Sequence, residues 1–134
     1  MKSLIVISLV AIVFSSCIVD TIEPRYDPRD KLVGYYDVEE YSETYNDVTN
    51  YSMHISKSGY DREIYLNNFY AVELRIYAIV NYDKITIPYQ VADGYEIEGV
   101  GTIHGNELHL SYSVKDRYNN SRTDFCETKA WFDY

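Results

Sequence analysis

From Lys31 onward, apolar and polar residues alternate with a period of two, and short groups of turn-forming residues interrupt the alternation. The segment "VELRIYAIV", residues 72–80, has an apolar residue at every even position, and "ELHLSYSVK", residues 107–115, repeats this arrangement. Because successive side chains of a strand point to opposite faces, the pattern predicts half-buried antiparallel strands. No segment keeps the 3.6-residue period of an amphipathic helix, so the sequence predicts an all-β protein.

The alternation divides into eight expected strands. They cover about 31–42, 48–57, 61–67, 70–81, 84–89, 94–104, 106–115 and 122–133. Between them lie pairs that contain Gly or Asn, which tolerate positive φ: Ser58-Gly59, Asn67-Asn68, Asp93-Gly94, Gly105-Asn106 and Asn119-Asn120. Uniformly short links favour pairing between sequence neighbours, and eight twisted strands can close on themselves. The predicted fold is an eight-stranded antiparallel up-and-down barrel over residues 31–134, with a sandwich or open roll as the alternatives.

The first seventeen residues predict an exported, lipid-anchored protein. Lys2 precedes the apolar run Leu4–Phe14, which is interrupted only by Ser8 and is followed by two serines and Cys17. The run is too short to span a bilayer, which takes about 20 residues, but it suits a signal peptide over residues 1–16. The segment resembles the lipobox of bacterial lipoproteins, which implies that Cys17 carries lipid. The alternative is an ordinary signal peptide, with Cys17 bonded to Cys126.

The remaining composition limits the partners of the mature chain. Residues 17–30 contain Pro24 and Pro28 and no periodic pattern, so they are expected to form a linker between the lipid and the barrel. The formal net charge of −9 disfavours nucleic-acid binding, because phosphate backbones repel acidic proteins. The expected location is the cell envelope, with the membrane contacted through the N-terminal lipid.

Several segments of the chain are similar to one group of proteins. "LVGYYDVEEYS", "HISKSG", "REIYLNNF", "ITIPYQ" and "GYEIEGVGTI" resemble small lipocalin-like lipoproteins of Bacteroides-type bacteria. The resemblance implies a calycin-type eight-stranded barrel on an outer-membrane lipoprotein that faces the periplasm or the outside. Gly34-Tyr35-Tyr36 is similar to the lipocalin Gly-x-Trp signature, with Tyr in place of Trp.

The inward-facing residues suggest a ligand site. An eight-stranded barrel has an interior wide enough for side chains or for one small ligand. The residues expected to line a pocket for a small apolar or amphipathic ligand are Tyr36, Met53, Leu74, Ile76, Ile97 and Tyr112. The same residues would equally fill a solid core, in which case exposed Tyr41, Tyr45 and Tyr118 are candidates for contacting a protein partner.

No catalytic or cofactor motif accompanies this pattern. The sequence has no Gly-x-Ser-x-Gly, phosphate-binding loop or Cys-x-x-Cys, so neither an enzyme nor a cofactor is expected. His104, Glu107 and His109 fall on one face of an expected hairpin and have the donors of a zinc site, but an exposed polar face explains them equally. Alternation places Cys126 inside as a small apolar residue.

Four acidic residues gather where the first expected strand ends. Glu39, Glu40, Glu43 and Asp47 are interpreted as a solvated loop. The alternative is a calcium site, but the spacing lacks the Asp-x-Asp-x-Asp-Gly pattern of an EF-hand.

The anchor can be tested on the mature protein. Mass spectrometry of the amino terminus is expected to find Cys17 as the first residue, carrying acyl chains. Two or more chains are needed for stable attachment to a membrane. An unmodified Cys17, or one bonded to Cys126, would contradict the prediction.

Overall fold

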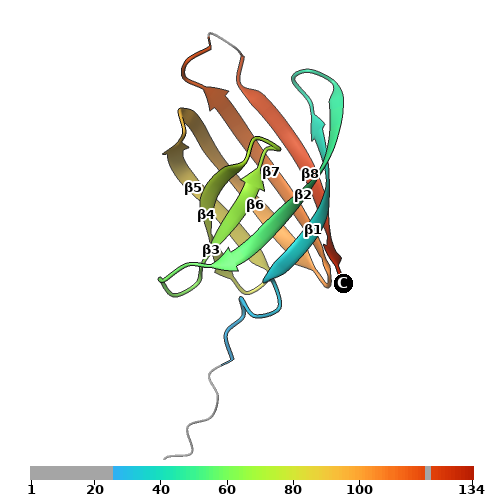
Figure 1. The fold of residues 1–134 in the computed structure, drawn as a ribbon, viewed down its shortest axis with the longest axis vertical. Helices are drawn as coiled ribbons and strands as arrows, with labels where there is room; N and C mark the ends of the chain where they lie inside the picture. The colour runs from blue at the N-terminus through green and yellow to red at the C-terminus, as the bar shows by residue number, and fades with distance from the viewer. Residues whose placement is uncertain (1–25, 120–121) are drawn as a thin grey trace, which may run out of the picture.

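The chain folds into a closed β-barrel (Figure 1). The computed structural model describes residues 26–119 and 122–134, so Cys17, the expected signal peptide and most of the expected linker lie outside the described residues. The strands are β1 (Gly34–Ser42), β2 (Asp47–Lys57), β3 (Glu63–Phe69), β4 (Leu74–Asn81), β5 (Lys84–Ala92), β6 (Tyr95–His104), β7 (Glu107–Asp116) and β8 (Asp124–Asp133). Each strand pairs with its sequence neighbour, and β1 also pairs antiparallel with β8. The predicted meander barrel is therefore confirmed, and the sandwich and open roll are wrong.

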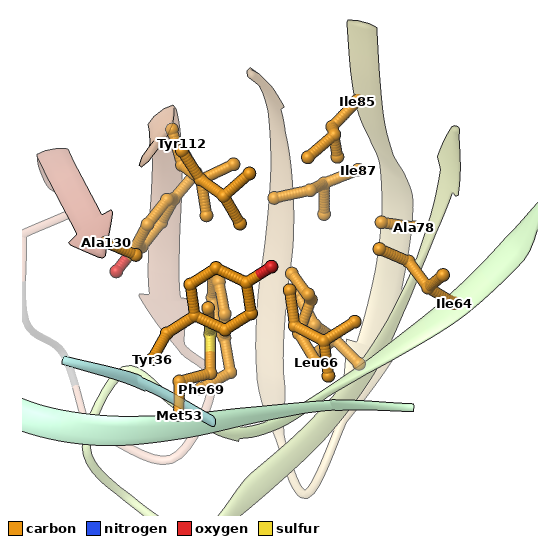
Figure 2. Close-up of a cluster of buried hydrophobic side chains, with 14 of the residues drawn as sticks. Tyr36, Met53, Ile64, Leu66, Phe69, Ala78, Ile85, Ile87, Tyr112 and Ala130 are labelled. Atoms are coloured by element: carbon orange, nitrogen blue, oxygen red, sulfur yellow. The ribbon is translucent and has the colours of Figure 1, made fainter. Parts of the chain in front are cut away.

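The period-two pattern is what places side chains inside the barrel. The even positions from 36 to 42 in β1 and from 108 to 114 in β7 are buried, while their neighbours face outward or stay partly exposed. Side chains from all eight strands form a single apolar cluster. Figure 2 shows Tyr36, Leu66 and Ile87, from three different strands, projecting into the same interior space. At about 25 cal/mol per Å² of buried apolar surface, this cluster is the main source of stability.

A turn before β1 closes one end of the barrel, here called the base. Leu32 is 1% exposed, and its carbonyl accepts a hydrogen bond of 2.9 Å from the Tyr36 hydroxyl. The Arg29 guanidinium donates to the carbonyls of Ser58, Tyr60 and Glu63 at 3.3, 2.8 and 2.9 Å. Arg29 falls within the expected linker, yet it contacts the barrel, and β1 begins at Gly34 rather than at residue 31.

The opposite end of the barrel is here called the mouth. The connections at residues 43–46, 70–73 and 93–94 surround it, together with residues 117–119 and 122–123 between β7 and β8. In Figure 1 the mouth lies at the top, while the described N-terminal segment and the C-terminus lie at the bottom.

The prediction of a tight turn at Asn67-Asn68 is wrong. Asn67 pairs with Arg75 in the ladder, and Asn68 adopts a φ of 63° within a bulge that shifts the register before Phe69. Asn68 does take the positive φ that its side chain tolerates, but as a bulge rather than as a turn. The turn occupies residues 70–73, where Tyr70, Ala71 and Glu73 also have positive φ. The Asn68 side chain holds this turn by accepting a 2.9 Å hydrogen bond from the Glu73 N–H.

The fifth strand continues three residues beyond its expected end. A bulge between Ile87 and Gln90 lets the strand pass Pro88, which has no N–H to donate to a ladder. The Gln90 amide then bonds both the N–H and the carbonyl of Tyr77, at 3.0 and 2.8 Å. A side chain thus replaces part of the ladder between β4 and β5, which pair over only three residues of each strand.

Gly99 allows β6 and β7 to approach closely. A Cβ at Gly99 would lie 2.5 Å from both the Ser111 carbonyl oxygen and the Tyr112 Cβ. The glycine therefore leaves space for the neighbouring strand.

The substitution Gly99→Ala is expected to lower the free energy of unfolding by about 1 to 3 kcal/mol, because backbone atoms must move to admit the methyl group. Chemical denaturation measures the change. Gly59→Ala is the matched control, since a Cβ there meets nothing within 4 Å. Equal stability of the two variants would contradict this account of the strand contact.

Candidate functional site

The six predicted ligand residues come together in the barrel core. Tyr36 and Tyr112 are 2% and 4% exposed, and Met53, Leu74, Ile76 and Ile97 are each 1% exposed. All six belong to the apolar cluster, where the Tyr112 ring packs 4.4 Å from the Phe69 ring. The six side chains are therefore part of the buried core, and none of them lines the two hollows described below.

Two carboxylates lie inside the barrel just below the mouth. Glu40 on β1 and Asp124 on β8 are each 4% exposed, and they are here called the carboxylate pair. Glu40 was interpreted as part of a solvated acidic loop, and that interpretation is wrong for this residue. The signal was present in the sequence, since Glu40 follows Tyr36 and Val38 at the inward spacing of two.

Four hydroxyl groups from different parts of the barrel donate hydrogen bonds to the carboxylate pair. The Tyr51 hydroxyl donates to Glu40 Oε2 at 2.8 Å, and the Tyr112 hydroxyl donates to the same oxygen. The Ser42 hydroxyl donates to Asp124 Oδ1 at 2.5 Å, and the Tyr70 hydroxyl donates to Asp124 Oδ2. Among the described residues, no Lys, Arg or His forms an ion pair with either carboxylate. The carboxylate pair is thus solvated by neutral donors alone.

Burial shifts the titration of this cluster. Loss of solvent raises the pKa of Glu40 to about 7, the Tyr51 hydrogen bond opposes the rise, and the nearby charge of Asp124 adds to it. Loss of solvent is also the main cause of the raised pKa of Tyr51 and of Tyr70, which stay protonated donors. Cys126, correctly expected inside, has a pKa raised by burial and by both carboxylates, which disfavours the reactive thiolate.

Two hollows open above the carboxylate pair. One, of about 170 Å³, is lined by Glu40, Ser42, Tyr45, Asp47, Thr49, Tyr70 and Asp124. The other, of about 180 Å³, is lined by Tyr45, Tyr70, Tyr95, Val114, Asp116, Arg122 and Asp124. Because Tyr45, Tyr70 and Asp124 line both, the two hollows are adjacent, and together they form the candidate site.

A polar group without a partner lies beside Glu40. Thr128 on β8 is the register partner of Glu40 on β1, so both side chains point into the barrel. Thr128 is 3% exposed, and its hydroxyl has no hydrogen-bond partner. An unpaired buried hydroxyl costs stability, typically about 1 to 3 kcal/mol, so its retention calls for an explanation.

The histidine hairpin adopts the expected register on the outside of the barrel. His104 pairs with Glu107, and Thr102 pairs with His109. His109 Nε2 lies 2.8 Å from Glu107 Oε1, whereas His104 Nε2 lies 3.0 Å from the Thr102 hydroxyl. Within residues 26–119 and 122–134, no three His, Cys, Asp or Glu side chains are placed to hold a metal ion.

Comparison with known proteins identifies no relative. No protein-family model matches the chain, and no curated protein sequence matches it. In the part of the chain that the structure describes, there is no helix with the length and apolar character needed to cross a bilayer. The case for a function therefore comes from the mouth itself.

Replacing Glu40 tests the electrostatics of the cluster. The raised pKa means that the folded protein binds the Glu40 proton more tightly than the unfolded chain, so stability falls as the pH rises from about 4.5 to about 7. Glu40→Gln removes this loss, and the variant is expected to exceed the parent in unfolding free energy by up to about 3 kcal/mol above pH 7. At pH 4 the two proteins are expected to be equally stable.

Thermal or chemical unfolding over this pH range measures the difference. Glu39→Gln is the matched control, because Glu39 neighbours Glu40 in sequence but faces solvent. A Glu40→Gln variant that is less stable than the parent at pH 8 would show that the ionised carboxylate stabilises the folded protein.

Proposed function

We propose that the protein is a cell-envelope lipoprotein that binds a small amphipathic molecule at the mouth of its barrel. The single observation that carries the proposal is a carboxylate pair buried beneath two adjacent hollows. Buried carboxylates with no cationic partner reduce stability, and sites of this kind commonly serve function. The apolar cluster below them holds the barrel rigid, so the side chains around the mouth are supported from beneath.

The orientation of the barrel fits a lipid anchor at Cys17. The described chain starts at Tyr26, at the base, which is the end away from the mouth. Tyr26 lies nine positions after Cys17, and an extended chain over that many steps reaches about 30 Å. A lipid at Cys17 would therefore hold the base toward the membrane and leave the mouth facing the aqueous compartment. The resemblance to lipocalin-like lipoproteins agrees with this arrangement and remains part of the proposal.

A second candidate is an interaction module for a protein partner. Tyr41, Tyr45 and Tyr118 are 39%, 48% and 84% exposed. Exposed tyrosines are frequent in protein interfaces because they combine a large apolar area with a polar tip. The hollows favour the small-molecule proposal, because a flat protein interface has no need of buried carboxylates.

A blocking substitution distinguishes the two candidates. The protein purified from its native envelope is expected to carry a small molecule, which denaturing extraction and mass spectrometry release and detect. Thr49→Trp is expected to abolish this occupancy, because Thr49 lines the first hollow and is solvent-exposed.

Thr86→Trp is the matched control, since Thr86 is exposed on β5 and lines neither hollow. It is expected to retain the bound molecule. An empty parent protein, or equal occupancy in the parent and Thr49→Trp, would overturn the small-molecule proposal.

A further inference from the structure

The charge at the mouth is unbalanced within the described chain. The four donors to the carboxylate pair are hydroxyl groups, which carry no positive charge. The negative charge of Asp124 contributes to the raised pKa of Glu40. In a partly dehydrated site, an uncompensated negative charge attracts a cation far more strongly than it would in water. The formal charge of −9 on the whole chain acts in the same direction.

The walls of the hollows have the chemistry that accommodates an organic cation. Tyr45 and Tyr70 line both hollows, and Tyr95 lines the second, with its ring 6.3 Å from the Tyr70 ring. The face of an aromatic ring attracts cations, and rings arranged around a pocket recognise alkylated ammonium groups. The apolar faces of the tyrosine rings also pack favourably against an apolar substituent on the cation. A small inorganic ion has no such substituent.

One cationic side chain of the protein, Arg122, already lies over an aromatic ring at this site. The Arg122 guanidinium carbon lies 5.7 Å from the centre of the Tyr45 ring, and Arg122 lines the second hollow together with Asp124. No ion pair joins Arg122 to Asp124 among the described residues. Arg122 therefore lies at the rim, above the Tyr45 ring, and leaves the carboxylate pair without a direct positive partner.

We infer that the mouth binds a small organic cation, either a protonated amine or a quaternary ammonium, between its tyrosine rings and above the carboxylate pair. The inference rests on the proposed function and specifies the chemistry of its ligand. The cation would supply the direct ion-pair partner that neither Glu40 nor Asp124 has among the described residues. Glu40 and Asp124 themselves line the hollows, so a bound cation would lie directly against the two carboxylates.

A pair of isosteric probes isolates the role of charge. Choline and 3,3-dimethylbutan-1-ol have nearly the same shape, but only choline is charged, and its charge does not depend on pH. Calorimetric titration of the full mature protein is expected to show at least tenfold tighter binding of choline. Equal affinity for the two probes, or no binding of choline, would overturn the inference.

Two further variants assign the binding to the mouth. Glu40→Gln is expected to weaken choline binding about tenfold, and its predicted stability at neutral pH, at least equal to that of the parent, separates this loss from unfolding. Arg122→Gln is expected to strengthen choline binding several-fold, because it removes a competing cation from the Tyr45 ring. Glu39→Gln is expected to leave the affinity unchanged. Unchanged affinity in both Glu40→Gln and Arg122→Gln would show that choline binds elsewhere.

The proposed function and this inference fail on different results. If a native molecule is lost in Thr49→Trp, the result supports a binding site at the mouth. If the two probes then bind with equal affinity, the preference of that site for cations is overturned. If the parent protein binds choline but carries no native molecule, the result supports the cation site. The same result overturns the proposal that the protein carries a small molecule in its native envelope.

Discussion

The pairing of β1 with β8 is the constraint on which the rest of the structure depends. Eight residues of each strand pair, from Tyr35 with Asp133 to Ser42 with Cys126. This pairing removes both edges of the sheet, which would otherwise be exposed to association with other chains. It also turns every inward position toward a common interior, whatever residue stands there. Glu40 opposite Thr128 is buried for the same geometric reason as Val38 opposite Ala130.

The interior changes character along the barrel axis. Near the base, Leu32 and the Arg29 hydrogen bonds close the barrel over apolar side chains. Toward the mouth, the inward positions of β1 pass from Val38 to Glu40 and Ser42, so the same strand supplies first the core and then the polar cluster. The apolar part supplies most of the stability, and the polar part reduces it. This division lets a small barrel tolerate a costly site at one end without losing its fold.

The sequence predicted the fold well because alternation records which face of each strand is buried. It predicted the bounds less well where tertiary contacts decide them. Nothing local distinguishes Asn68 in a bulge from Asn68 in a turn, and the continuation of β5 past Pro88 depends on the Gln90 side chain reaching Tyr77. The candidate site was missed for another reason. Glu40 lies among other acidic residues, and that local charge outweighed its inward spacing. The hydroxyl donors come from β1, β2, β7 and the turn after β3, so no single segment of the sequence shows them together.

The inward positions occupied by Glu40, Asp124 and Thr128 would serve the fold better if they were apolar, because each now buries a charge or an unpaired hydroxyl. Four hydroxyl groups reduce that cost without removing it, since none carries a compensating charge. Binding and active sites commonly lower the stability of the fold that carries them. Here Glu40 and Asp124 line open hollows whose walls carry tyrosines, so the two buried carboxylates stand where a ligand can reach them.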